Sequence, residues 1–163
     1  MSPMRRVTIL ACGEPLRGDD AVADALVRAL PEPARRLADV RHVGALMPDD
    51  LRSAGSPVIV VDAVLGLPAG TVVDLPLDEV ASLGARGIAP ASSHALPLAT
   101  VLAIAERLAG ALPEGRFIGV AGDGFALGDS LSSEVRAAVA PGAARLGHWC
   151  RTLAAQGTVG TCA

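Results

Sequence analysis

The feature that most constrains the fold of this chain is a run of β-branched residues in its first half. Residues 57–63 read Pro-Val-Ile-Val-Val-Asp-Ala, with no alternation between apolar and polar positions. A strand with one face in water would alternate. The segment therefore predicts a strand covered on both faces, as in a parallel sheet that lies between helices. Asp62 then stands at the C-terminal end of the most buried strand.

Strand and helix patterns alternate along the rest of the chain. Short β-rich or alternating runs predict further strands at 7–12, 38–43, 71–75 (as an edge) and 116–121. Apolar residues at helical spacing predict helices at 19–30, from 48, at 94–110, and from 130 or 132 to about 155 with a break near Pro141. Glycine, proline and serine predict loops at 13–18, 81–93 and 122–129.

This order of elements predicts the fold class. Alternating strands and helices favour an α/β three-layer sandwich, with a mostly parallel twisted sheet and helices on both faces. A length of 163 residues suits one domain, which we place at 1–163, with residues 156–163 expected to be a disordered tail.

Composition removes several classes of function. The formal net charge of −3 argues against a nucleic-acid partner. All 14 basic residues are arginine, so Schiff-base and P-loop lysine chemistry are excluded. No apolar run reaches the roughly 20 residues that span a bilayer, and the run at 7–12 does not resemble a signal peptide. We therefore expect a cytoplasmic protein with no membrane partner.

Polar residues follow three of the predicted elements at one edge of the sheet. Ligands of parallel α/β sheets bind beyond the C-terminal ends of the strands. There the sequence places the Asp19–Asp20 pair, Asp62 and His94. Carboxylates and an imidazole suit nickel, zinc or cobalt. The sequence thus predicts a divalent-metal site at this edge.

Structural roles for the same residues stay open. Asp20 could instead cap a helix, and His94 could cap or pack. A carboxylate at the position of Asp62 is costly to bury unless it is paired, hydrogen-bonded or metal-bound, so a structural pairing is its alternative. Ser92 and Ser93 precede the histidine, but no Gly-x-Ser-x-Gly nucleophile elbow is present, which argues against a serine hydrolase.

Four segments resemble the motifs of the hydrogenase maturation protease family, and they follow one another in the order that the family has. They are residues 9–24, 58–72, 92–98 and 117–135. The resemblance implies a twisted sheet between helices, and an endopeptidase that removes the C-terminal extension of a nickel–iron hydrogenase large-subunit precursor. It also implies that the family's metal-ligand positions fall on Asp20, Asp62 and His94. Two positions depart from the family pattern: Glu14 replaces an asparagine and Ala21 replaces a glycine.

The resemblance leads to a specific set of expectations about the reaction. Nickel is expected to arrive already bound in the precursor, with no organic cofactor, and Asp62 is the candidate to activate the attacking water. We expect a monomer whose partner is the precursor. Two rival interpretations remain: a non-catalytic metal- or partner-binding module of the same fold, and a flavodoxin-like nucleotide or flavin binder. Residues 13–18 lack the GxGxxG spacing that would favour the latter.

Overall fold

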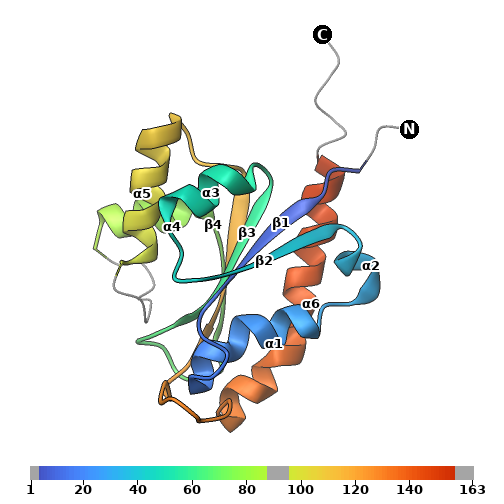
Figure 1. Ribbon diagram of the computed structural model, residues 1–163, viewed down its shortest axis with the longest axis vertical. Helices are drawn as coiled ribbons and strands as arrows, with labels where there is room; N and C mark the ends of the chain where they lie inside the picture. The colour runs from blue at the N-terminus through green and yellow to red at the C-terminus, as the bar shows by residue number, and fades with distance from the viewer. Residues whose placement is uncertain (1–3, 88–95, 157–163) are drawn as a thin grey trace.

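A computed structural model of the chain describes residues 4–87 and 96–156. It is an α/β sandwich in which a central twisted sheet lies between two groups of helices (Figure 1). Five strands form the sheet: β1 (Val7–Cys12), β2 (Ala38–Gly44), β3 (Val58–Val64), β4 (Val72–Pro76) and β5 (Gly115–Ala121). A short 3-10 helix, η1 (Gly18–Ala21), and six α-helices complete the described chain: α1 (Val22–Arg28), α2 (Glu32–Arg35), α3 (Pro48–Ala54), α4 (Leu77–Ala85), α5 (Leu98–Ala109) and α6 (Ser133–Gln156).

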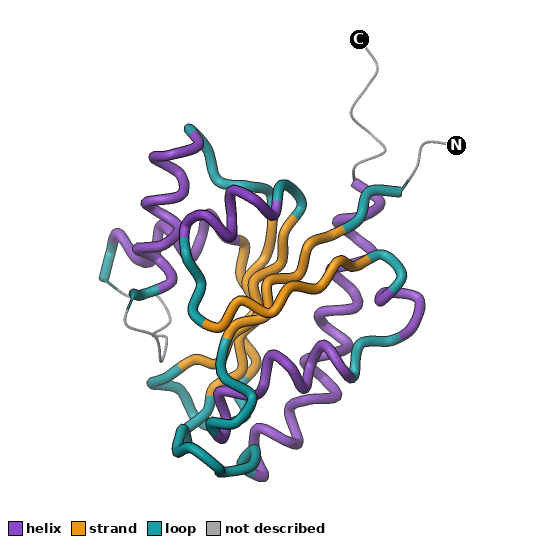
Figure 2. The backbone as a smooth tube through the Cα atoms, viewed as in Figure 1, coloured by secondary structure: helices purple, strands orange, loops and turns teal. Residues whose placement is uncertain are grey.

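The sheet has the strand order β2-β1-β3-β5-β4. The pairs β1–β2, β1–β3 and β3–β5 are parallel, whereas β4 pairs with β5 in the antiparallel sense at the edge. The C-terminal ends of β1, β3 and β5 therefore lie side by side, and the segments that follow β1 and β5 gather at this end of the molecule (Figure 2).

Alternate residues of the central strand supply two separate cores. Ile59, Val61 and Ala63 pack under α1, α2 and α6, while Val58, Val60 and Val64 pack under α3, α4 and α5. Every residue of β3 is buried, as the unbroken β-branched run predicts. The same alternation directs Asp62 to the second of these faces, because it shares the parity of Val60 and Val64.

The predicted fold class and all five predicted strands are confirmed, including the edge position of β4. The loop predicted at 81–93 is wrong in its first part, because α4 continues to Ala85. Leu77 and Val80 are buried along one side of that helix, and this packing outweighs the glycine and serine that suggested a loop. Residues 88–93 lie outside the described residues.

The helix predicted from His94 to about residue 110 begins later than expected. It starts at Leu98, after Pro97 with ψ of 142°, and ends at Gly110 in the left-handed conformation. A residue before proline disfavours the α region, which explains why Leu96 is not helical. His94 itself lies outside the described residues, as do residues 157–163 of the predicted tail. Within residues 4–87 and 96–156, no helix has the length and apolarity that crossing a bilayer requires.

The break predicted near Pro141 is also wrong, since α6 runs through this proline without interruption. Ala138 and Ala143 are buried in the core on both sides of it, and Gly142 packs against Leu26 of α1. Their packing holds the helix together, although Pro141 has no N–H to donate to the preceding turn. The Ser132 hydroxyl accepts the Val135 N–H at 3.4 Å, which confirms Ser132 as a cap of this helix.

Replacing Pro141 by alanine is expected to stabilise the protein. Pro141 is exposed, so the change opens no cavity. It restores a helical hydrogen bond and removes the clash of the proline ring with the preceding turn. Together these effects raise the free energy of unfolding by up to about 3 kcal/mol. Urea denaturation measures this gain. Pro33→Ala is the control, because Pro33 is exposed in the first turn of α2, where proline is tolerated. Equal stability of Pro141→Ala and the original protein would contradict the account.

Candidate functional site

The carboxylate of Asp19 connects the two loops that follow β1 and β5. Its side chain is fully buried. Oδ1 accepts the Ser132 N–H at 2.7 Å, and Oδ2 accepts the Ser132 hydroxyl at 3.0 Å. Oδ2 also accepts the N–H groups of Asp123 at 3.1 Å and Gly124 at 3.2 Å. One side chain therefore anchors the 122–132 segment to η1.

These hydrogen bonds also decide the ionisation of Asp19. Burial alone would raise the pKa of this carboxyl, because it penalises the charged form. The N–H groups of Ser132, Asp123 and Gly124, with the Ser132 hydroxyl, favour the charged form and hold the pKa below its ordinary value. Asp19 is thus an ionised structural group at neutral pH.

Asp20 lies directly over the end of β1. Its Oδ2 accepts the backbone N–H of Glu14 at 2.8 Å, and its side chain is buried. Gly13 makes this approach possible, since a Cβ there would lie 2.1 Å from the Asp20 carbonyl oxygen. No side-chain cap hydrogen bond is made at the start of η1 or α1, so the capping alternative for Asp20 is not observed.

Asp62 occupies the same end of the sheet on the neighbouring strand. It is 4% exposed, and its Oδ1 accepts the N–H of Ala63 at 2.8 Å. On β5 it pairs with Gly119, which brings no side chain beside the carboxylate. On its other side β3 pairs with β1, and the last pair is Val61 with Ala11. The residues that follow this pair on the two strands are Asp62 and Cys12.

Cys12 connects the two carboxylates electrostatically. Burial raises the pKa of its thiol well above the ordinary value, and the charges of Asp62, Asp50 and Asp20 raise it further. Both Asp20 and Asp62 are therefore close enough to act on this sulfur. A thiol held in its protonated form is a poor nucleophile, so cysteine-protease chemistry is not supported at this position.

A small cavity opens beside Asp20, on the side of β2. Its volume is about 210 Å³. The residues that line it are mostly small or acidic: Cys12, Gly13, Pro15, Asp20, Ala21, Asp24 and His42. The cavity gives a ligand direct access to the Asp20 carboxylate region. His42 belongs to this wall, although a strand residue of an alternating segment carried no functional signal in the sequence.

The structure brings two of the three predicted metal ligands to one edge. Asp20 and Asp62 are both buried there, and η1 contacts β3. His94 lies outside the described residues, so the complete set stays a prediction. Among the residues that the structure describes, no three His, Cys, Asp or Glu side chains are arranged to hold a metal ion.

The two departures from the family pattern leave the Asp20 contacts intact. Residue 14 donates its backbone N–H to the Asp20 carboxylate, and any residue except proline can do this. The Glu14 side chain is exposed. Ala21 has φ of −77° and ψ of 0°, so the position does not need a glycine for a positive φ.

Sequence reasoning missed the role of Asp19, which it treated as a helix-opening acid. Its partner Ser132 is 113 residues away, and no local pattern connects the two. The only signal was a second acidic residue adjacent to a predicted ligand.

Comparison with solved structures identifies close structural relatives. The NiFe hydrogenase maturation protease HybD from Thermococcus kodakarensis is 27% identical, with 91% of this chain and 99% of that chain covered at a TM-score of 0.65. The hydrogenase maturating endopeptidase HybD from E. coli is 25% identical over 95% of this chain and 94% of its own, at a TM-score of 0.67. An endopeptidase from Escherichia coli, whose structure was solved in solution, is 25% identical. The match covers 90% of this chain and 93% of that chain, at a TM-score of 0.70. No protein-family profile and no curated protein sequence matches the chain.

Asp19→Asn is expected to lower the free energy of unfolding by about 1–3 kcal/mol at pH 7. An amide cannot accept hydrogen bonds from all the donors that the carboxylate satisfies. The contribution of Asp19 is present above the unfolded carboxyl pKa of about 3.9 and is lost as the pH falls through the lower folded value. The stability gap between the two proteins should therefore narrow in acid. Urea denaturation from pH 7 downward measures it.

Asp123→Asn is the matched control for this experiment. The Asp123 side chain is exposed, and this residue contributes to the network only through its backbone N–H. Two results would contradict the role assigned to Asp19. One is that Asp19→Asn loses no more stability than Asp123→Asn. The other is that the difference in free energy of unfolding between the original protein and Asp19→Asn stays constant in acid.

Proposed function

We propose that this chain, a peptidase of the hydrogenase maturation protease family, acts on a nickel–iron hydrogenase large-subunit precursor. The reaction is the removal of the C-terminal extension of that precursor. The observation that carries this proposal is the pair of buried carboxylates, Asp20 and Asp62, at the C-terminal edge of the parallel sheet. The likeness to HybD proteins over nearly the whole of both chains supports the same reaction class.

In this proposal nickel is part of the substrate rather than a resident cofactor. The precursor presents the metal at the edge of the sheet, where the oxygen donors Asp20 and Asp62 complete its coordination together with the imidazole of His94. Carboxylate and imidazole ligands fit a divalent metal of this kind. The contact would place the scissile peptide bond in register, so that an unloaded precursor is not cut.

The hydrolytic step needs a base that is close to the scissile carbonyl. Asp62 is the candidate, since it lies at the end of the fully buried central strand. Each of the two carboxylates accepts one backbone N–H, Asp20 from Glu14 and Asp62 from Ala63, and each keeps a second oxygen. A water molecule gives up a proton to Asp62 and attacks the carbonyl carbon. The C–N bond then breaks, and the leaving amine takes up the proton. Cys12, with its raised pKa, takes no part as a nucleophile.

The cavity beside Asp20 offers a place for the substrate chain next to the metal contact. Small residues such as Gly13 and Ala21 leave it open, and its carboxylates come from Asp20 and Asp24. A segment of the precursor that follows its bound nickel would reach this cavity without a rearrangement of the sheet.

Asp62→Asn is expected to abolish processing, because the amide can neither accept the water proton nor supply a charged ligand. The assay is intact mass spectrometry of the nickel-loaded large-subunit precursor after incubation with each protein. The original protein should release a short C-terminal peptide, and His94→Ala should also fail to release it.

Asp49→Asn is the control variant, since Asp49 is 84% exposed on α3 and its only described ion pair is with Arg52. It should cleave at the original rate. Full cleavage by folded Asp62→Asn and His94→Ala proteins would refute the assignment of these residues. Binding of the loaded precursor without cleavage by the original protein would favour a non-catalytic binding module.

A further inference from the structure

A second cavity lies at the opposite end of the sheet, where β5 begins and β4 ends. Its volume is about 370 Å³. Pro76 of β4 pairs with Arg116, whereas Asp62 pairs with Gly119 further along β5. The chain leaves the sheet edge after Pro76 to form α4, so Gly115, the first residue of β5, has no partner on the β4 side. The cavity is therefore separate from the candidate active site.

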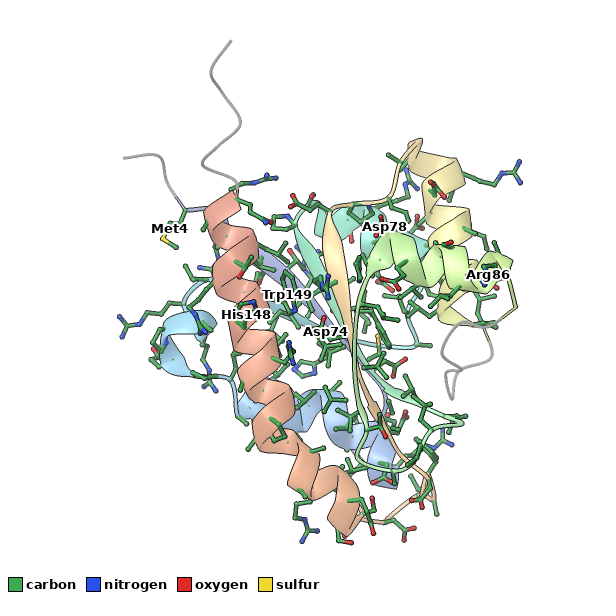
Figure 3. The ribbon with its side chains drawn as sticks, turned by 180° about the vertical axis from the view of Figure 1, so that it is seen from behind. Met4, Asp74, Asp78, Arg86, His148 and Trp149 are labelled. Carbon is green, nitrogen blue, oxygen red and sulfur yellow. The ribbon has the colours of Figure 1, made fainter. Side chains whose placement is uncertain are left out.

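The wall of this cavity is built around Trp149, the one tryptophan of the chain. Its indole Nε1–H donates to Asp74 Oδ2 at 2.8 Å, and the Arg116 guanidinium lies 3.9 Å from the centre of its ring. Arg116 in turn donates to Asp74 Oδ1 from Nε at 3.1 Å and from Nη2 at 2.6 Å. Figure 3 shows Trp149 and Asp74 close together between α6 and the sheet. The indole is thus held in one orientation before any ligand binds.

The rest of the lining combines apolar walls with acidic residues. Pro76, Leu112, Pro113 and Leu153 supply the apolar part. Asp78 and Glu114 are exposed and also line the cavity. Within the described residues no basic side chain forms an ion pair with either of them.

The charge balance of the cavity is therefore negative. Its one lining cation, Arg116, is paired with Asp74, and the more exposed Arg145 shares that same carboxylate at 3.5 Å. Among residues 4–87 and 96–156, no cation pairs with the carboxylates of Asp78 and Glu114. A rigid tryptophan with apolar neighbours and a polar rim is typical of the small set of residues that dominate protein–protein binding.

We propose that this cavity binds an arginine or lysine side chain of a protein partner, carried on an apolar segment. The aliphatic stem of such a side chain packs against Leu112, Leu153 and Trp149, and its charged head reaches Asp78 and Glu114. This docking site lies away from the catalytic edge and does not depend on the proposed proteolysis.

The single tryptophan makes the proposal directly testable, because the chain also contains no tyrosine. The probe is the tripeptide acetyl-Leu-Arg-Leu-amide, added to the full-length protein. Binding is followed by Trp149 fluorescence and by the one indole N–H signal in the nuclear magnetic resonance spectrum. We expect a saturable change with this peptide, and a clearly weaker one with acetyl-Leu-Gln-Leu-amide or acetyl-Leu-Glu-Leu-amide.

Variants separate the acidic rim from general charge effects. Asp78→Asn and Glu114→Gln should each weaken binding about two- to fivefold, and the double variant should weaken it further. Glu79→Gln is the matched control, because Glu79 is exposed in the same turn of α4 but does not line the cavity. It should bind the arginine peptide nearly as well as the original protein.

Three results would overturn the proposal. The first is an indole signal that does not respond to the arginine peptide at millimolar concentration. The second is an equal response to the glutamine peptide, which would show apolar binding without charge selection. The third is tighter binding of the glutamate peptide, which would mean that Arg116 rather than the acidic rim determines the ligand.

Discussion

The hydrogen bonds of the buried Asp19 carboxylate are the interactions on which the candidate site of this protein depends. The described segments after β1 and β5 contain no regular strand that would pair them, although Phe125 and Leu131 pack against the core. Asp19 joins these segments through the Ser132, Asp123 and Gly124 donors, at the cost of burying a charge that hydrogen bonds keep ionised. The adjacent residue, Asp20, is thereby held over Gly13 at the end of β1.

The parallel sheet supplies the second half of this arrangement. Because β1 and β3 run side by side in the same direction, their final residues share one edge, and Cys12 comes to lie beside Asp62. Burial raises the pKa of the Cys12 thiol, and the negative charges of Asp62, Asp50 and Asp20 raise it further, so the thiol stays protonated. The same charge makes the edge suited to a cation, so it agrees with hydrolysis that is directed by a metal in the substrate better than with a covalent thiol mechanism.

Much of this framework could be predicted from the sequence, because it depends on local patterns. The unbroken run at 58–61 identified the buried central strand, and the order of strands and helices indicated the sandwich. The errors arose where tertiary packing outweighs local preference. The helix α4 was not predicted, because glycine and serine at 81–93 suggested a loop, and α6 continues through Pro141. Within the site, the places of Asp20 and Asp62 at the sheet edge could be predicted from the strands that precede them, and their role as metal ligands stays a prediction. The bond between Asp19 and Ser132 could not be found, since it joins residues far apart in sequence.

The most direct test of the account is the dependence of cleavage on nickel in the substrate. The same large-subunit precursor is prepared with and without nickel, incubated with the original protein, and analysed by intact mass. The account predicts loss of a short C-terminal peptide from the nickel-loaded precursor alone. Equal cleavage of both precursors would contradict the metal contact at Asp20 and Asp62, and cleavage of neither would contradict the proposed protease reaction itself.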